Sequence, residues 1–397
     1  MLWLNSKQDR PDFKWFQNFM VNRMHEGIRV ERPIDKEAEA LQLADEAASV
    51  LRSEYGIDNP NSPKQVIAFM ESLDDDTVRK YCSKEDGKLS SAADGLVPLA
   101  DLGVDWALQI LKYRTNNGII TNITSVMSCS DLNGLIHPEV SFQKTNRISY
   151  KAPALMNINK EHLWTMVRPY KEGDYIWSAD VKNQEPWIMA HITKAKRLIE
   201  LAEEANESGG SIYKAVYNDI FKHPIESEEA YAEMKVAWNM LTYGGSLQGL
   251  QKSCSIIDAS AVYNYFNSIK ELKDWRGRTF AMKRSGVQGV PTVFGTMVYT
   301  DKVGGALQRS LMDLPIQGTG ADILALLVKH INDQTVQLGI SDYIKVYYTR
   351  HDEIIFEVDK AWQDEIGADS VRDEIANLTE HRIDDWVPFR VDVEQLV

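Results

Sequence analysis

Two aspartates stand at the ends of predicted β-strands that lie far apart in the sequence. Asp352 lies in the polar turn of a predicted hairpin, between runs at 343–349 and 353–358 that are rich in Tyr, Ile, Val and Phe. Asp180 ends a second apolar run, which begins at Tyr175. If the strands pair, the two carboxylates face each other, and at ~4 Å their repulsion is roughly 4 kcal/mol for an effective dielectric near 20. Such a pair is suited to divalent cations, because carboxylates, water and substrate phosphates are the usual magnesium environment.

A predicted helix at 228–243 separates the two acidic strands, and Gly244-Gly245 closes it. Lys235, Asn239 and Tyr243 recur at four-residue spacing and therefore share one stripe. At 1.5 Å rise per residue the lysine and the tyrosine are ~12 Å apart, about the span from a nucleotide's phosphates to its base. Taken alone, the stripe is better explained by a surface helix with one ordinary lysine. Its combination with the acidic pair favours nucleotide chemistry.

The composition limits the class of protein. The chain has 397 residues, 44% of them hydrophobic, and a net charge of -14, which excludes an indiscriminately basic nucleic-acid coat protein. Basic tracts at 142–151 and 273–284 remain candidates for phosphate contacts, although an isolated basic tract is more often a solvated face. The cysteines have no metal-site spacing, and we expect a reducing compartment. The N-terminal ten residues lack a signal-peptide core and no apolar run approaches a membrane span, so we expect a soluble intracellular protein.

Several further helices and strands are predicted from N-cap residues, from the positions of proline and glycine, and from the spacing of apolar residues. We expect a helix at 35–56 with Asp35 as N-cap, and a second at 63–73 capped by Ser62. The apolar face of the first would consist of Leu41, Ala44, Ala48 and Leu51. We also expect helices at 104–114, 186–205 and 323–331, a tight loop at 315–320, a small hairpin at 290–299 and a final strand at 387–396.

These segments, in this order, resemble the DNA polymerases of family A, which are related to bacterial DNA polymerase I. Five stretches carry the resemblance: Asp180 with Glu185 and His191, Lys235 with Tyr243-Gly244, His351-Asp352-Glu353, the run from Thr145 to Ile158, and the run from Leu314 to Asp322. The similarity extends from about Met20 to the C-terminus. The minimal length favours a phage- or plasmid-borne member.

The resemblance implies an α+β, right-hand polymerase fold with an antiparallel palm sheet, helical fingers and a helical thumb. The palm would consist of residues 1–36, 136–195 and 311–397, the thumb of 37–135 and the fingers of 196–310. It implies a template-directed DNA polymerase that extends a DNA primer with dNTPs. Because the family's proofreading domain has no counterpart here, a separate exonuclease is a candidate partner, as is a processivity factor. A bacterial or phage-infected cytoplasm is the expected location, without a membrane.

The resemblance also implies roles for individual residues. Asp180, Asp352 and the backbone carbonyl of Val181 would hold two magnesium ions. Lys235 would neutralise charge on the triphosphate and assist the leaving pyrophosphate. Glu185 would exclude a sugar 2′-hydroxyl.

The remaining positions match family residues around the nascent base pair and the primer–template junction. Tyr243 and Asn239 would contact the incoming nucleotide. The positions that touch primer or template are Arg147, Gln317 and His351, with Glu353 beside the metals.

The chain departs from the family pattern around the triphosphate. An arginine four residues before the motif lysine is usual, and Tyr231 stands there. The histidine upstream of this helix is replaced by Tyr213, and the arginine two residues after the palm glutamate by Trp187. The pocket is therefore short of cations, which leaves Lys235 with Lys214 or Lys222 as candidates to help it.

Two other functions remain open. A phage-type single-subunit RNA polymerase shares the two aspartates and the Lys…Tyr-Gly helix, but Glu185 argues against it because RNA synthesis needs open space at the sugar edge. An inactive polymerase-fold module that only binds primer–template would explain the missing arginine and histidine, but it would not explain why Asp180 and Asp352 are both present.

Overall fold

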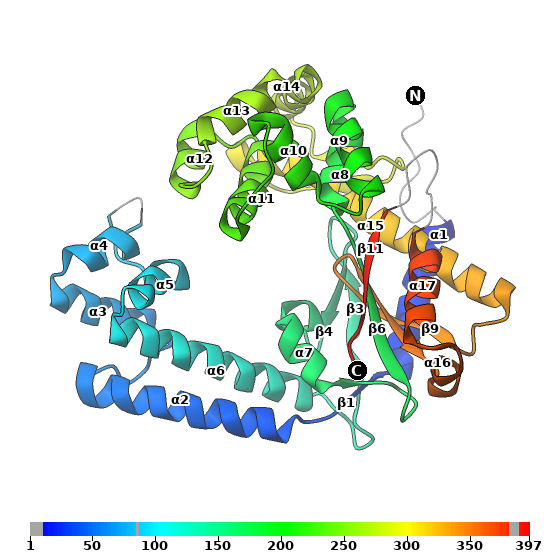
Figure 1. Cartoon of the computed structure of the whole chain (residues 1–397), viewed down its shortest axis with the longest axis horizontal. Helices are drawn as coiled ribbons and strands as arrows, with labels where there is room; N and C mark the ends of the chain where they lie inside the picture. The colour runs from blue at the N-terminus through cyan, green and yellow to red at the C-terminus, as the bar shows by residue number, and fades with distance from the viewer. Residues whose placement is uncertain (1–10, 85–86, 381–388) are drawn as a thin grey trace. The chain divides into compact units, whose positions relative to one another are not determined.

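The computed structural model describes residues 11–84, 87–380 and 389–397, so the expectation for the first ten residues lies outside the described part. The chain forms two compact units (Figure 1). The first consists of Met1–Ile28, Pro138–Met156 and Pro169–Val397, and the second of Arg29–His137 and Asn157–Arg168.

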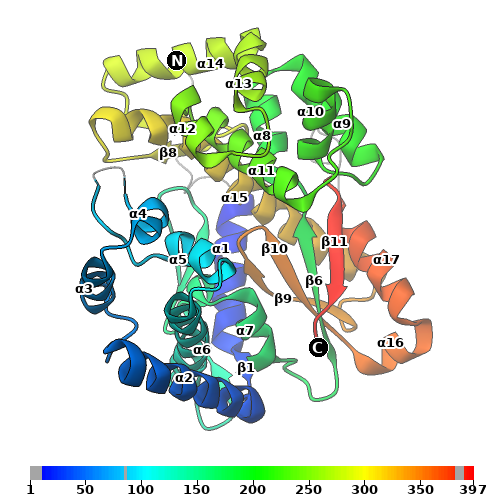
Figure 2. The same ribbon diagram turned by 60° about the vertical axis from the view of Figure 1, so that its left-hand side comes forward.

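A four-stranded antiparallel sheet lies at the centre of the first unit, in the order β11-β6-β10-β9 (Figure 2). Its strands are β6 (Tyr175–Val181), β9 (Ile344–Arg350), β10 (Glu353–Val358) and β11 (Val391–Gln395). The predicted hairpin and the predicted pairing of the two acidic strands are both confirmed. Asp180 is in register with Glu353, which places Asp352 one residue beyond it. The described part of the predicted strand at 387–396 is β11; residues 387 and 388 lie outside the described part.

Four helices of the first unit belong with this sheet: α1 (Pro11–Glu26), α15 (Gly304–Leu338), α16 (Lys360–Ile366) and α17 (Ala368–Thr379). Of these, α1 and α15 contact β9, while α17 contacts β6 and β11. Strands β6, β9 and β10 are largely buried on both faces, as expected for a sheet that helices cover, whereas β11 is largely exposed. A short hairpin, β3 (Glu139–Phe142) with β4 (Ile148–Lys151), completes this part and packs against α1.

The predicted loop at 315–320 is wrong, because α15 continues through it without a break. Pro315 has no N–H and costs the helix one backbone hydrogen bond. Thr319 adds a separate bond, from its hydroxyl to the Pro315 carbonyl at 2.6 Å. The glycines of this stretch serve packing rather than turning. A Cβ at Gly318 would lie 2.8 Å from Thr292 and from Val298, and a Cβ at Gly320 2.7 Å from Gln184.

The same helix corrects the expectation that no apolar run approaches a membrane span. By length and composition α15 is the one helix in the described residues that could cross a membrane. However, 83% of its most apolar window is buried inside the protein. It is therefore accounted for as the core helix of the first unit.

The rest of the first unit is helical apart from one hairpin. Its elements are α8 (Gln184–Thr193), α9 (Lys196–Glu207), α10 (Ile212–Phe221), α11 (Glu228–Thr242), α12 (Leu247–Ser253), α13 (Ala259–Ser268), α14 (Lys270–Arg284), β7 (Gly289–Pro291) and β8 (Met297–Tyr299). The predicted helix at 228–243 and the hairpin at 290–299 are confirmed. The single helix predicted at 186–205 is two helices, because Lys194 adopts a left-handed conformation at φ 57° and ends α8.

The second unit contains α2 (Ile34–Tyr55), α3 (Pro63–Leu73), α4 (Asp76–Cys82), α5 (Ala93–Asp101), α6 (Asp105–Met127) and α7 (Lys160–Met166), with a small sheet of β2 (Leu135–Ile136), β1 (Ile28–Val30) and β5 (Val167–Arg168). Its core includes Leu51, Ile57, Met70, Leu96 and Trp106. The Ser62 cap of α3 is confirmed, since its hydroxyl accepts from the Gln65 amide at 3.4 Å.

Three predictions in this unit need correction. Asp35 is not the N-cap of α2; it lies in the first turn, and no side chain caps the helix. Ala44 and Leu51 are buried as predicted, but Leu41 is 45% exposed and Ala48 is not buried; Ala40 and Ala47 complete the buried face instead. The helix predicted at 104–114 extends to Met127.

Candidate active site

The two strand-end aspartates line one cavity of about 570 Å³ in the first unit. Asp180 reaches it from the end of β6 and Asp352 from the β9–β10 turn, and both are half-buried. The turn is sharp because His351 adopts a left-handed conformation at φ 54°, which leaves Asp352 to lead directly into β10. The sequence prediction that pairing of the strands brings these carboxylates to one place is confirmed.

The carboxylates of this cavity suit a magnesium ion that also binds water and phosphate better than a metal ion held by protein side chains alone. Within residues 11–84, 87–380 and 389–397, no group of three or more His, Cys, Asp or Glu side chains is placed to hold a metal ion. Two carboxylates that leave room for water and phosphates are the usual magnesium arrangement. Val181, whose carbonyl is the further predicted ligand, lines the same cavity.

One carboxylate that lines this cavity was not expected from the sequence. Asp392 of β11 is in register with Asp180 and lines the cavity. It forms an ion pair with Lys182 at 2.5 Å, which partly neutralises it. No motif points to Asp392; its place depends on β11 pairing with β6, a contact between segments more than 200 residues apart.

Lys235 also lines the cavity, together with Asn239 from the next turn of α11. Its ammonium nitrogen lies 4.5 Å from the centroid of the Tyr231 ring and 5.9 Å from that of Tyr213. These are the two tyrosines that replace the expected arginine and histidine. Burial raises the pKa of the Tyr213 hydroxyl, with the negative charge of Glu185 as the next cause, so this phenol stays protonated at neutral pH.

Glu185 is held by two of the residues predicted to touch primer or template. Its Oε1 accepts a hydrogen bond from Gln317 Nε2 at 2.6 Å and another from Arg147 Nη2 at 3.2 Å. Glu185 lies in the first turn of α8 and lines the cavity beside Asp180. The structure therefore brings Arg147 and Gln317 to the glutamate, a contact that the sequence did not indicate.

Tyr243 lies at the C-cap of α11 and lines an adjoining cavity of about 630 Å³ with Gly244 and Phe280. Burial raises the pKa of the Tyr243 hydroxyl, and the charges of Glu185 and Asp313 raise it further. Asp313 was missed by the sequence analysis. Burial, followed by the charge of Glu185, raises the pKa of its carboxyl. The only sequence signal for it is its position one helical turn before Gln317 on α15.

Two further predicted site residues, His351 and Glu353, also lie outside the main cavity. His351 is exposed in the hairpin turn and, with Arg147, lines a narrow crevice beside α15. Glu353 is 4% exposed at the start of β10, in register with Asp180 on one side and Arg350 on the other. It does not line the cavity, and its predicted place beside the metals stays a prediction.

Comparison with known proteins identifies the family. The model of DNA polymerase family A matches residues 33–395, and the chain belongs to this family. It is 25% identical over 401 residues to DNA polymerase I of Rhizobium leguminosarum, a match that covers 92% of this chain and 38% of that protein. DNA polymerase theta of Drosophila melanogaster is 26% identical over 278 residues, with 63% and 13% covered.

The fold is also similar to a solved structure. The polymerase domain of Pol1 from M. smegmatis, in complex with DNA primer–template and dNTP, has a TM-score of 0.77 and 24% identity to this chain. The match covers 96% of this chain and 68% of that one. The chain spans about two fifths of the length of the first curated relative. The predicted family and the predicted α+β fold class are confirmed.

Proposed function

We propose that this chain is a template-directed DNA polymerase that extends a DNA primer with dNTPs. The observation that carries the proposal is the single cavity that Asp180, Asp352 and Lys235 line, in a chain that belongs to DNA polymerase family A. Carboxylates that can bind magnesium, together with an ammonium that can bind phosphate, match the charges of a metal-bound triphosphate.

Two magnesium ions would be held by Asp180, Asp352 and the carbonyl of Val181. When bound, they would activate the primer 3′-hydroxyl and neutralise charge on the triphosphate. The 3′ oxygen attacks the α-phosphorus, a new phosphodiester bond forms, and the bond to pyrophosphate breaks. Lys235 holds the triphosphate in line and balances the charge that develops on the leaving pyrophosphate.

Glu185 would set the sugar specificity. Its carboxylate is fixed by Gln317 and Arg147 beside Asp180, so it can occupy the space that a 2′-hydroxyl needs. Tyr243 and Asn239, on the same helix stripe, would pack against the incoming nucleotide. Gln317, Arg147, His351 and Glu353 are proposed to line the path of primer and template.

We assign the palm to residues 1–36, 136–195 and 311–397, the thumb to 37–135 and the fingers to 196–310. The four-stranded sheet within the palm ranges and the helices α9–α14 within the fingers range support this division. The second compact unit supports a separate thumb, but it also includes residues 157–168. Residues 1–10 and 381–388 of the palm lie outside the described part.

Primer–template DNA and dNTPs are the proposed partners, in a bacterial or phage-infected cytoplasm. The similar Pol1 domain was solved with both ligands, which supports the proposal. A separate exonuclease and a processivity factor are further candidate partners.

A labelled primer annealed to a template, supplied with dNTPs or rNTPs in separate reactions, tests the proposal. We expect magnesium-dependent extension with dNTPs that follows the template sequence. Efficient extension with rNTPs would favour the single-subunit RNA polymerase instead. Binding of the primer–template without extension in either pool would mean that the chain is an inactive binding module.

A further inference from the structure

The triphosphate end of the cavity contains fewer cations than the family pattern predicts, because tyrosines occupy positions 213 and 231. Three lysines line this cavity: Lys182, Lys214 and Lys235. Lys182 is already paired with Asp392 at 2.5 Å. Lys214 and Lys235 form no ion pair with any residue that the structure describes.

One aromatic ring lies against both of these lysines. The ammonium nitrogen of Lys235 is 4.5 Å from the Tyr231 ring centroid, and that of Lys214 is 5.2 Å from the same centroid. The negative face of an aromatic ring attracts ammonium groups within about 6 Å. Tyr231 therefore gathers two positive charges from different helices, and because these charges repel each other, an anion bound between them would be favoured.

The Tyr231 ring is itself held in place. Its hydroxyl donates to Ser211 Oγ at 3.1 Å, and the same Oγ caps α10 by accepting from the Tyr213 amide at 3.2 Å. The ring also meets Tyr213 edge to face, with centroids 6.1 Å apart at 72°. These contacts connect α11, which carries Lys235, to the first turn of α10, which carries Lys214.

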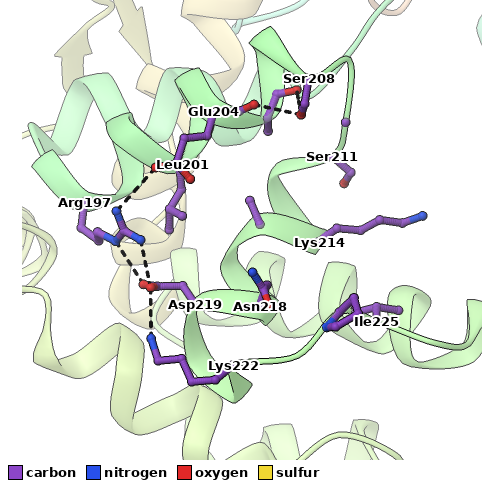
Figure 3. A pocket seen from close by; sticks show the side chains of 14 residues that line it. Arg197, Leu201, Glu204, Ser208, Ser211, Lys214, Asn218, Asp219, Lys222 and Ile225 are labelled. Atoms are coloured by element: carbon purple, nitrogen blue, oxygen red, sulfur yellow. Dashed lines mark hydrogen bonds and ion pairs between the residues drawn. The ribbon is translucent and has the colours of Figure 1, made fainter.

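A neighbouring lysine provides the contrast. Lys222, at the C-cap of α10, lies 3.3 Å from Asp219, a carboxylate that also binds Arg197 at 2.9 Å. These three residues line a neighbouring cavity of about 640 Å³, which Lys214 also lines, but Lys222 does not line the first cavity. Figure 3 shows Lys214 directed away from this ion-paired cluster. Its charge is available to a ligand, whereas that of Lys222 is compensated.

We propose that Lys214 is the second cation that binds the nucleotide triphosphate, and that Tyr231 is a positioning residue that holds both Lys214 and Lys235 for this task. The inference rests on the proposed polymerase function and deepens it. In this proposal Lys214 on α10 and the neutral ring of Tyr231 on α11 together replace the arginine and histidine that the family pattern predicts.

Steady-state primer extension with Lys214→Ala and Lys222→Ala tests the cation. Lys214→Ala should raise the KM for dNTP about tenfold, the loss expected for one hydrogen bond to a charged group, with a smaller change in kcat. Lys222→Ala is the matched control on the same helix and should retain the wild-type KM. Equal values of KM for the two variants would overturn the assignment. Failure of the wild-type chain to extend a primer would instead refute the proposed function.

The positioning role of Tyr231 needs a readout that does not depend on turnover. Binding of magnesium tripolyphosphate, measured by calorimetry, should weaken in Tyr231→Leu and in Lys214→Ala but remain near wild type in Tyr231→Phe, which keeps the ring. In the double variant of Lys214→Ala with Tyr231→Leu, the two losses should not add fully, because they remove one shared contact. Unchanged tripolyphosphate binding in Tyr231→Leu, or equal losses in the Phe and Leu variants, would refute the positioning role.

Discussion

Replacement of Glu185 by alanine should relax the selection of deoxyribonucleotides over ribonucleotides. The carboxylate lies beside Asp180 in the cavity and is fixed by two donors, Gln317 at 2.6 Å and Arg147 at 3.2 Å. A side chain held in this way cannot move aside for a 2′-hydroxyl without the loss of both contacts. If Glu185 were only a first-turn acid favoured by the helix dipole, its removal would leave the selectivity unchanged.

The size of the effect follows from the geometry. Rejection of one small group by a fixed wall is worth ~1–3 kcal/mol, which corresponds to about 10–200-fold in relative kcat/KM for dNTP and rNTP. The effect on stability should be smaller. The Arg147 and Glu185 side chains remain 29% and 35% exposed, and a pair of this exposure contributes ~0.2–1 kcal/mol. Selectivity should therefore change far more than the free energy of unfolding.

The assay compares kcat/KM for one dNTP and its rNTP on the same primer–template. Glu185→Gln is the shape control: if exclusion is steric, the glutamine variant retains most of the selectivity that Glu185→Ala loses. Gln317→Ala removes the shorter of the two contacts and should produce an intermediate loss. Unchanged selectivity in Glu185→Ala would refute the sugar-gate assignment, and equal loss in the glutamine and alanine variants would show that charge, not shape, excludes the hydroxyl.

Three further predictions address the metals, the triphosphate and the packing of α15. Asp180→Asn and Asp352→Asn should each reduce extension more than a thousandfold, about 4 kcal/mol, while primer–template binding in a gel-shift assay is retained; extension within tenfold of wild type would contradict a metal-ligand role. Lys235→Ala should weaken dNTP binding and slow the chemical step in single-turnover experiments. If the variant keeps the wild-type affinity and rate, Lys235 does not take part in triphosphate chemistry. Gly318→Ala should lower the free energy of unfolding by about 1–3 kcal/mol, because the added Cβ lies 2.8 Å from neighbouring side chains. Gly277→Ala, at a helical site with open space, should instead stabilise by ~0.5–1 kcal/mol in urea denaturation, and similar effects of the two changes would refute the packing argument.

Local patterns were sufficient for the elements whose signals are short-range. The hairpin that carries Asp352 was predicted because two β-rich runs flank a polar turn, and α3 because a serine cap precedes a proline at the first helical position. The prediction of a loop at 315–320 also relied on local patterns alone, and it was wrong. Proline and glycine often interrupt a helix when only local preferences act, but α15 is continuous here, and Gly318 and Gly320 lie where neighbouring side chains leave no room for a Cβ.

The family and the order of its motifs were also readable from the sequence, and with them most residues of the candidate site, although not Asp392 or Asp313. The contacts among those residues were not. Gln317 and Arg147 are 132 and 38 residues from Glu185 in the chain, and no spacing rule connects them. Lys235 and Tyr231 share a helix face at four-residue spacing, but Lys214 joins them only because α10 packs beside α11. The sequence determined which groups are present, and only the packing of separate helices and strands decided which of them meet, because side chains distant in the chain come within contact range only through tertiary structure.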